Sequence, residues 1–115
     1  MQRRRRLNTG DILLADLDPA RGREQGGRRP VVVVSHQRYS VIPGLFLAVP
    51  LTSTDRGLRH HVAVAADEAT GLARASYAMT EQIRALAYDR IERQLGAVDE
   101  ASMTQISRYL HLFIG

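Results

Sequence analysis

A loop rich in glycine and arginine that runs directly into four valines restricts the fold of this chain more than any other feature. Residues 22–30 contain three glycines and three arginines and end at Pro30, and residues 31–34 are all valine. Glycine permits positive φ, so the loop can turn tightly and a ligand can approach its main chain. The valines predict a buried strand because both of its faces are apolar. Since proline also pushes the preceding residue towards extended geometry, we expect Arg29 to be held at the rim of a rigid sheet, where it can bind an anion.

The 115 residues contain no repeat and no long linker, which predicts a single domain. We expect this domain to span residues 10–115, after a flexible arginine-rich leader over residues 1–9. All 16 basic residues are arginine, and the four at positions 3–6 account for the whole formal net charge of +4. The net charge is therefore weak support for a nucleic-acid site. The local cluster of Arg21, Arg23, Arg28 and Arg29 is better support.

Cysteine is absent, which excludes disulfides and thiolate metal sites. No apolar run approaches the roughly 20 residues that a helix needs to cross a bilayer. The basic N-terminus is also not followed by the apolar segment of a signal peptide. We therefore expect a soluble, cytoplasmic protein with no membrane partner.

Four short apolar segments bounded by turn-forming residues predict β-strands. They cover residues 11–17, 31–36, 45–51 and 61–65. Residues 67–71 predict a single helical turn.

Residues 76–86 predict a further strand, or a bent pair of strands, whose two faces differ. One face is apolar, whereas the other is too polar for a core and is expected to face a cleft. The polar face consists of Ser76, Thr80, Gln82 and Arg84. Glu81 falls on the apolar face, which leaves two interpretations open: a β-bulge shifts the register there, or Glu81 is buried against an arginine.

The C-terminal segment is the clearest helix in the sequence. Asp99 is a favourable N-cap and Glu100 lies in the first turn. Apolar residues then follow at helical spacing, at Met103, Ile106, Tyr109, Leu110 and Phe113. We expect this stripe to pack on the sheet. The predicted fold class is mainly β with a C-terminal α-helix, in which five to seven short antiparallel strands form a small, barrel-like sheet.

Five motifs occur in a fixed order along the chain. They are Gly10-Asp11-Ile12, then Ala15-Asp16-Leu17-Asp18-Pro19, then Gly22, Glu24-Gln25, Gly27 and Arg29 to Val33, then Val49 to Ser53, and last Glu81 to Arg84. Together they resemble the MazF/PemK (Kid) toxins of bacterial toxin–antitoxin pairs, over nearly the whole chain from Gly10 onward. The resemblance implies an SH3-like barrel of the CcdB/Kid type that works as a homodimer. It also implies an mRNA interferase, an endoribonuclease that cleaves single-stranded RNA and is inhibited by a cognate acidic antitoxin.

In that family a loop arginine and a threonine at a strand end carry the cleavage chemistry, and the resemblance assigns these catalytic roles to Arg29 and Thr52. RNA supplies its own nucleophile, the 2′-OH, so the protein must hold an in-line geometry, stabilise charge on the phosphate and help protons to move. Arginine offers a planar fork of donors that matches phosphate, and threonine offers a hydroxyl. This chemistry gives a 2′,3′-cyclic phosphate and a 5′-OH and needs no cofactor. We expect no metal site, because the acidic residues lack a recognisable ligand spacing.

The residues expected to bind the substrate are Arg23, Glu24, Ser53, Gln82 and Arg84. Arg23 stands where many members of the family have a serine, which affects the expected substrate preference. Two interpretations of Glu24 stay open: contact with substrate, or an ion pair that holds the loop closed. Gln82 and Arg84 likewise either contact RNA or are ordinary solvent-facing strand residues.

The general base is not identified by the sequence. Arginine is a poor base because its pKa exceeds about 12, so a histidine is the ordinary candidate. The chain offers His36, His60, His61 and His111. We expect His111 to be structural or exposed on the helix, and His60 and His61 to form a solvated pair more readily than a catalytic one.

Two other functions fit the fold. The first is a toxin that poisons gyrase by protein binding, and the second is a non-catalytic SH3-like module that binds nucleic acid. Both leave Arg29 and Thr52 without a chemical role, and RNA cleavage by the purified protein would exclude both.

Overall fold

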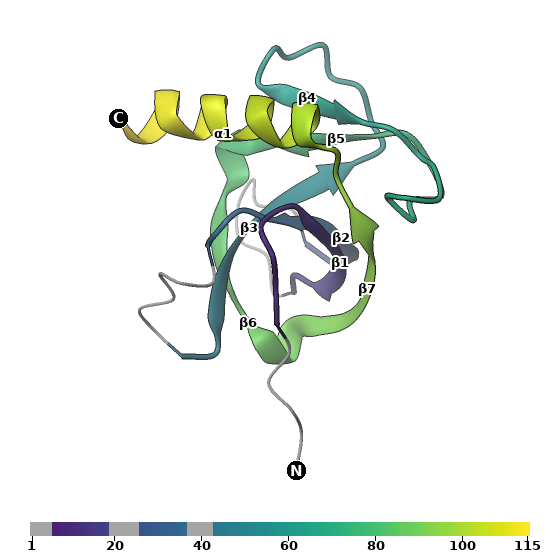
Figure 1. The fold of residues 1–115 in the computed structure, drawn as a ribbon, viewed down its shortest axis with the longest axis vertical. Helices are drawn as coiled ribbons and strands as arrows, with labels where there is room; N and C mark the ends of the chain where they lie inside the picture. The colour runs from purple at the N-terminus through teal and green to yellow at the C-terminus, as the bar shows by residue number, and fades with distance from the viewer. Residues whose placement is uncertain (1–5, 19–25, 37–42) are drawn as a thin grey trace.

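One antiparallel sheet of seven strands carries a single long helix (Figure 1). The computed structural model describes residues 6–18, 26–36 and 43–115. In chain order the strands are β1 (Asp11–Asp16), β2 (Arg28–Val33), β3 (Leu45–Thr52), β4 (His61–Val64), β5 (Ser76–Met79), β6 (Arg84–Ala87) and β7 (Ile91–Ala97). Two short 3-10 helices, η2 (Thr80–Gln82) and η3 (Tyr88–Arg90), flank β6, and α1 (Glu100–Ile114) ends the chain. The predicted fold class is confirmed.

The strands follow the order β4-β5-β3-β2-β1-β7, and β6 also pairs with β3. The central strand β3 is long enough for two partners, since its residues 45–48 pair with β6 and its residues 51–52 with β5. The sheet therefore divides at β3 and bends strongly (Figure 1). The strands β6 and β7 are joined through η3 and not by strand pairing, so the expected barrel closure is not seen among the described residues.

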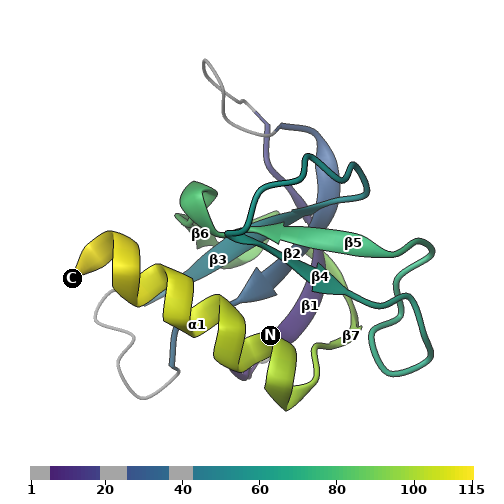
Figure 2. The same cartoon turned by 90° about the horizontal axis from the view of Figure 1, so that it is seen from above.

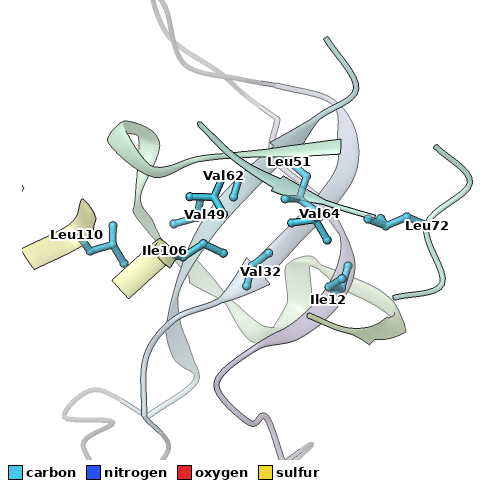
Figure 3. Close-up of a cluster of buried hydrophobic side chains, with 10 residues drawn as sticks. Ile12, Val32, Val49, Leu51, Val62, Val64, Leu72, Ile106 and Leu110 are labelled. Atoms are coloured by element: carbon cyan, nitrogen blue, oxygen red, sulfur yellow. The ribbon is translucent and has the colours of Figure 1, made fainter. Parts of the chain in front are cut away.

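Two hydrophobic clusters fill the two faces of the bent sheet. In the first, Ile106 and Leu110 of α1 pack on valines of the strands (Figure 3). Figure 2 shows α1 lying across the sheet beside β4. The second cluster includes Leu7, which is only 3% exposed. The packed domain therefore starts before residue 10, where we expected its boundary.

The second strand begins earlier than the sequence suggested. Its pairing with β1 extends from Val32 back to Arg28, whereas its pairing with β3 begins at Val31. One side of the strand is thus an edge at Pro30, where the missing N–H of proline costs no ladder bond. The predicted range of residues 31–36 was wrong at both ends, and Arg29 is a strand residue.

The bent pair of strands expected over residues 76–86 is confirmed, but its continuous polar face is not. The helix η2 separates β5 from β6 and resets the alternation of side chains between them. Thr80 is fully buried and donates a hydrogen bond to the carbonyl of His60 at 2.6 Å. Strand β7, which borders β1, had no clear signal in the sequence.

The helix α1 agrees with its sequence pattern. The Asp99 side chain accepts a hydrogen bond from the Ser102 amide at 2.7 Å, and this bond lowers the pKa of Asp99. Of the apolar stripe, Ile106 and Leu110 are buried, whereas Phe113 is half exposed. No helix in the described part of the chain is long and apolar enough to span a membrane.

Candidate active site

A cleft of about 370 Å³ lies at the C-terminal end of β3. One wall carries Arg29, Thr52 and Ser53, and the other wall includes Arg74 and Ser76. The first wall comes from the start of β2 and the end of β3, and the second from the segment that leads into β5. The structure therefore brings together both predicted catalytic residues and one of the predicted substrate-binding residues.

The arrangement of β2 and β3 brings Arg29 to the end of β3. The two strands are antiparallel, and their pairing ends with Val31 opposite Pro50. Beyond that point Thr52 pairs with Tyr77 of β5. Arg29 still reaches β3, because its side chain donates to the carbonyl of Leu51, the residue before Thr52. Both side chains therefore line the same cleft, although they are distant in the sequence.

The guanidinium of Arg29 is fixed by two backbone carbonyls. Its Nη1 donates to the carbonyl of Leu51 at 3.1 Å, and its Nε donates to the carbonyl of Gly26 at 3.4 Å. Burial lowers the pKa of Arg29, and the positive charge of Arg56 lowers it further. Arginine starts from a very high pKa, so the side chain stays charged near neutral pH. A positive charge held in partly desolvated surroundings favours the binding of an anion.

Thr52 is well placed to act as a hydrogen-bond donor. It is 7% exposed, and its hydroxyl accepts a hydrogen bond from the Thr54 amide at 3.2 Å. Because the hydroxyl oxygen is the acceptor in this bond, its hydrogen is available for a ligand. Ser53 and Thr54 also line the cleft, so hydroxyl groups are concentrated beside the arginine.

The charge of the cleft is entirely positive among the described residues that line it. They include Arg29 and Arg74 but neither aspartate nor glutamate. Arg28, the neighbour of Arg29, is occupied elsewhere, because its guanidinium is 2.6 Å from Glu92. The hydrogen bond and charge of Glu92 raise the pKa of Arg28.

The ends of the glycine-rich loop are tied together below the cleft. The amide of Gly27, which has a φ of +73°, donates to the Asp18 carboxylate at 2.7 Å. The amide of Leu17 donates to the carbonyl of Gly27 at 2.9 Å, and Arg90 donates to the carbonyl of Asp18. These contacts fix the point at which the chain enters β2. The predicted substrate-binding residues Arg23 and Glu24 lie outside the described residues.

Gln82 and Arg84 do not line this cleft. Arg84 lies opposite Ala48, in the other half of β3, and its Nη1 is buried without a hydrogen-bond partner among the described residues. Thr52 is the fourth residue after Ala48 in β3, which corresponds to a separation of about 13 Å along the strand. Within one chain, Gln82 and Arg84 therefore lie on a different part of the surface from the cleft.

The expectation of a solvated histidine pair was wrong. The side chain of His61 is 2% exposed, and its Nε2 lies 2.9 Å from the Glu81 carboxylate. The Nε2 of His60 lies 3.2 Å from the same oxygen. Glu81 is therefore neither at a bulge nor buried against an arginine, because η2 turns it toward the histidines. His111 is exposed on α1.

The sequence did not indicate that Arg74 and Ser76 line the same cleft. Ser76 was expected to face a cleft, but Arg74 lies in an irregular segment with no motif around it. Only the fold sets Arg74 opposite Arg29. The molecule is thus a small β domain with a positively charged cleft that is also lined by hydroxyl groups.

The fold is that of a known class of toxin. The chain belongs to the family of PemK-like, MazF-like toxins of type II toxin–antitoxin systems, which it matches over residues 8–114. It is 34% identical to endoribonuclease MazF9 of Mycobacterium tuberculosis, over 94% of this chain and 96% of that one. It is 32% identical to the endoribonuclease toxin MazF of Escherichia coli, over 92% of each chain. The predicted family and the predicted enzyme class, an endoribonuclease, are confirmed.

Solved structures agree with this assignment. MazF from Deinococcus radiodurans superposes with a TM-score of 0.82 at 25% identity, over 95% of this chain and 96% of that one. The same toxin in a MazE–MazF crystal structure gives a TM-score of 0.73 at 27% identity, with the same coverage.

Proposed function

We propose that this chain cleaves single-stranded RNA through attack of a ribose 2′-OH on the adjacent phosphate, with Arg29 and Thr52 acting on that phosphate. The observation that supports this most is that Arg29, bonded to the carbonyl of Leu51, and Thr52 line one cleft whose described lining residues carry no negative charge. A guanidinium fork and a hydroxyl on one face can hold two phosphate oxygens at once. Because backbone carbonyls and strands hold both groups, little reorganisation is needed when charge develops.

The bond between the 2′-oxygen and phosphorus forms while the bond to the 5′-oxygen breaks. Arg29 stabilises the charge on the phosphate and donates a proton to the leaving oxygen, a role that its lowered pKa favours. Thr52 donates its hydroxyl to a phosphate oxygen. The products are a 2′,3′-cyclic phosphate and a free 5′-OH. No histidine is among the described residues that line the cleft, so the base that accepts the 2′-proton is left unassigned.

The remaining residues contact RNA on either side of this phosphate. Ser53 and Arg74 are placed to bind the flanking backbone inside the cleft. Gln82 and Arg84 act further along the strand, as Arg23 and Glu24 do from the loop. An acidic antitoxin segment would compete for the same positive surface, which accounts for inhibition by a cognate partner. The protein acts as a homodimer on cytoplasmic RNA.

The first test is cleavage of single-stranded RNA by the purified protein in EDTA. We expect the wild type to cleave, and Arg29→Ala and Thr52→Ala each to lose about 10²–10³ in rate, as when one donor to a developing charge is removed. The matched controls are Arg28→Ala and Thr104→Ala, which lie outside the cleft and should retain activity. Circular dichroism establishes that all four variants are folded. An Arg29→Ala variant that cleaves like the wild type would refute the proposal.

The second test addresses the nucleophile. Replacing the one ribose 5′ to the cleaved bond with deoxyribose should block cleavage and leave binding nearly unchanged, because a single hydroxyl among many backbone contacts is removed. Mass spectrometry of the all-ribose products should find cyclic or 3′-phosphate ends and 5′-OH ends. Ends with 5′-phosphate would instead indicate a water-activating, metal-dependent nuclease. Absence of any cleavage would favour the gyrase-binding alternative.

A further inference from the structure

Two histidines and a glutamate form a compact, partly buried cluster outside the cleft. The side chains of His60, His61 and Glu81 place their ligand atoms within 4.8 Å of one another. The two imidazole Nε2 atoms point at the same carboxylate oxygen, at 3.2 and 2.9 Å. None of the three residues is among those that line the cleft, so the proposed cleavage chemistry does not use them.

The distances in this cluster resemble those in the ligand shell of a metal ion. Zinc bonds of about 2.0–2.2 Å at tetrahedral angles hold two ligand atoms roughly 3.4 Å apart. The two separations between imidazole nitrogen and carboxylate oxygen are somewhat shorter than this value, and all the ligand atoms lie within 4.8 Å of one another, so small side-chain shifts suffice to admit an ion. The set of two imidazoles and one carboxylate is also one that zinc accepts, with a fourth position left for water.

The three side chains are held in place by three different elements. The buried hydroxyl of Thr80 in η2 donates to the carbonyl of His60 at 2.6 Å, which fixes the histidine pair opposite Glu81. The ring of His60 packs edge-on against Phe113 of α1, with 5.6 Å between ring centroids. His61 begins β4 and lies opposite Met79 of β5. Ligands fixed by packing bind a metal without the entropic cost of ordering them.

The second ring nitrogen of His61 does not distinguish the metal-bound cluster from the metal-free one. Its Nδ1 is buried and has no hydrogen-bond partner among the described residues. In the metal-free ring one nitrogen faces Glu81 and the other is already unpartnered, whichever tautomer is present. Coordination through Nε2 therefore leaves the number of unpartnered nitrogens unchanged.

We propose that His60, His61 and Glu81 form a binding site for one divalent transition-metal ion of the zinc class. Glu81 carries exposed surface, which gives an ion a path into the site. Sequence spacing did not reveal the site, because Glu81 is 20 residues from His61 and the turn before β4 is needed to bring both imidazoles to one side.

Isothermal titration of the untagged full-length chain with zinc chloride tests this proposal. We expect one ion per chain, and no comparable heat with magnesium chloride, which prefers oxygen ligands. The variants His60→Gln and Glu81→Gln should weaken zinc binding by more than the roughly 10–100-fold that loss of an outer-shell partner costs. The matched control, His111→Gln, changes an exposed histidine outside the cluster and should bind zinc like the wild type.

Cobalt(II) provides a readout that does not depend on the variants. The wild-type protein with one equivalent of cobalt should show the intense visible absorption of a tetrahedral site, and zinc should abolish it. Absence of zinc binding by the wild type would overturn the proposal, as would equal binding by magnesium or unchanged binding by both cluster variants. The cluster shares no lining residue with the cleft, so these outcomes are independent of RNA cleavage in EDTA.

Discussion

Arg29 carries its charge in surroundings that disfavour charge. Burial and the charge of Arg56 both lower its pKa, while two backbone carbonyls hold its guanidinium in place. Burial and the repulsion from Arg56 cost the free protein free energy, and a phosphate bound to Arg29 offsets part of this cost because it is negatively charged. Thr52 adds a donor to the same cleft, since its hydroxyl oxygen accepts from the Thr54 amide and its hydrogen is available for a ligand.

The first prediction at this scale concerns Arg29→Lys. A lysine keeps the charge but lacks the planar fork, so cleavage should fall by about 10²–10³. The ordinary pKa of lysine, about 10.4, should be lowered by the same burial and the same charge of Arg56. The protonated, active form is then lost as the pH rises through this lowered pKa. Residual activity should therefore decline towards alkaline pH, over a range in which the wild-type arginine stays charged.

The measurement is kcat/KM for RNA cleavage as a function of pH. Arg28→Lys is the matched control, because Arg28 is exposed and paired with Glu92. A lysine variant with wild-type activity and a wild-type pH profile would show that Arg29 acts only as a point charge.

At the scale of elements, the sequence predicted those helices and strands whose formation depends on residues within a single segment. The helix α1 has its cap and its stripe within one segment, and β1, β3 and β4 each alternate or run apolar between turn residues. The start of β2 was misplaced because pairing with β1 continues past Pro30, and no local signal in β2 reports a partner strand. The strand β7 was missed for the same reason, since its exposed residues are supported by pairing with β1.

The candidate site follows the same division. Arg29 and Thr52 each stood in a motif, so they could be singled out separately. That both line one cleft follows from the way β2 and β3 lie together, which the sequence does not state. Arg74 and the partners of Glu81 come from contacts between distant segments, so only the folded chain reveals them.

The turn at Ala69 and Thr70, which precedes the second wall of the cleft and packs against Gly96 of β7, gives a prediction at the element scale. An added Cβ at Gly96 would lie 2.2 Å from the carbonyl oxygen of Ala69, a backbone atom that cannot move without the turn. The amide of Ala97 donates to this same carbonyl at 2.9 Å. Gly96→Ala should therefore cost about 1–3 kcal/mol of unfolding free energy, as overpacking does. It should also displace the segment carrying Arg74 and lower the cleavage rate.

Urea denaturation and cleavage assays measure the two effects. Gly44→Ala is the control, because its φ of +82° strains an alanine while nothing lies within 4 Å of the added Cβ. We expect it to lose stability but not activity. If Gly96→Ala cleaves RNA as fast as the wild type, the position of this turn does not affect the activity of the cleft.

At the scale of the whole molecule, two parts of the surface differ from the rest in charge or in apolar character. One is the positive cleft, and the other is the end of α1, where Leu112 and Ile114 are 71% and 73% exposed. Beside them a hollow of about 390 Å³ is lined partly by Val34 and Leu110. Exposed large apolar side chains that cluster in this way are typical of an interface. Arg84 lies outside the cleft of its own chain. An RNA-binding surface that joins the cleft to Arg84 therefore requires more than one copy of the chain.

The last prediction is a homodimer that uses this end of α1. In a twofold dimer the same patch packs against itself, and two clefts contribute to one longer binding surface. Sedimentation should report about twice the chain mass of 12.8 kDa at micromolar concentration. Ile114→Glu places a charge in the interface twice, once from each copy, and should shift the protein to monomer. Gln105→Glu, an equally charged change at another exposed position of α1, should leave the dimer intact. A wild-type protein that stays a stable, fully active monomer would contradict the dimer, and an Ile114→Glu dimer would move its interface to another face.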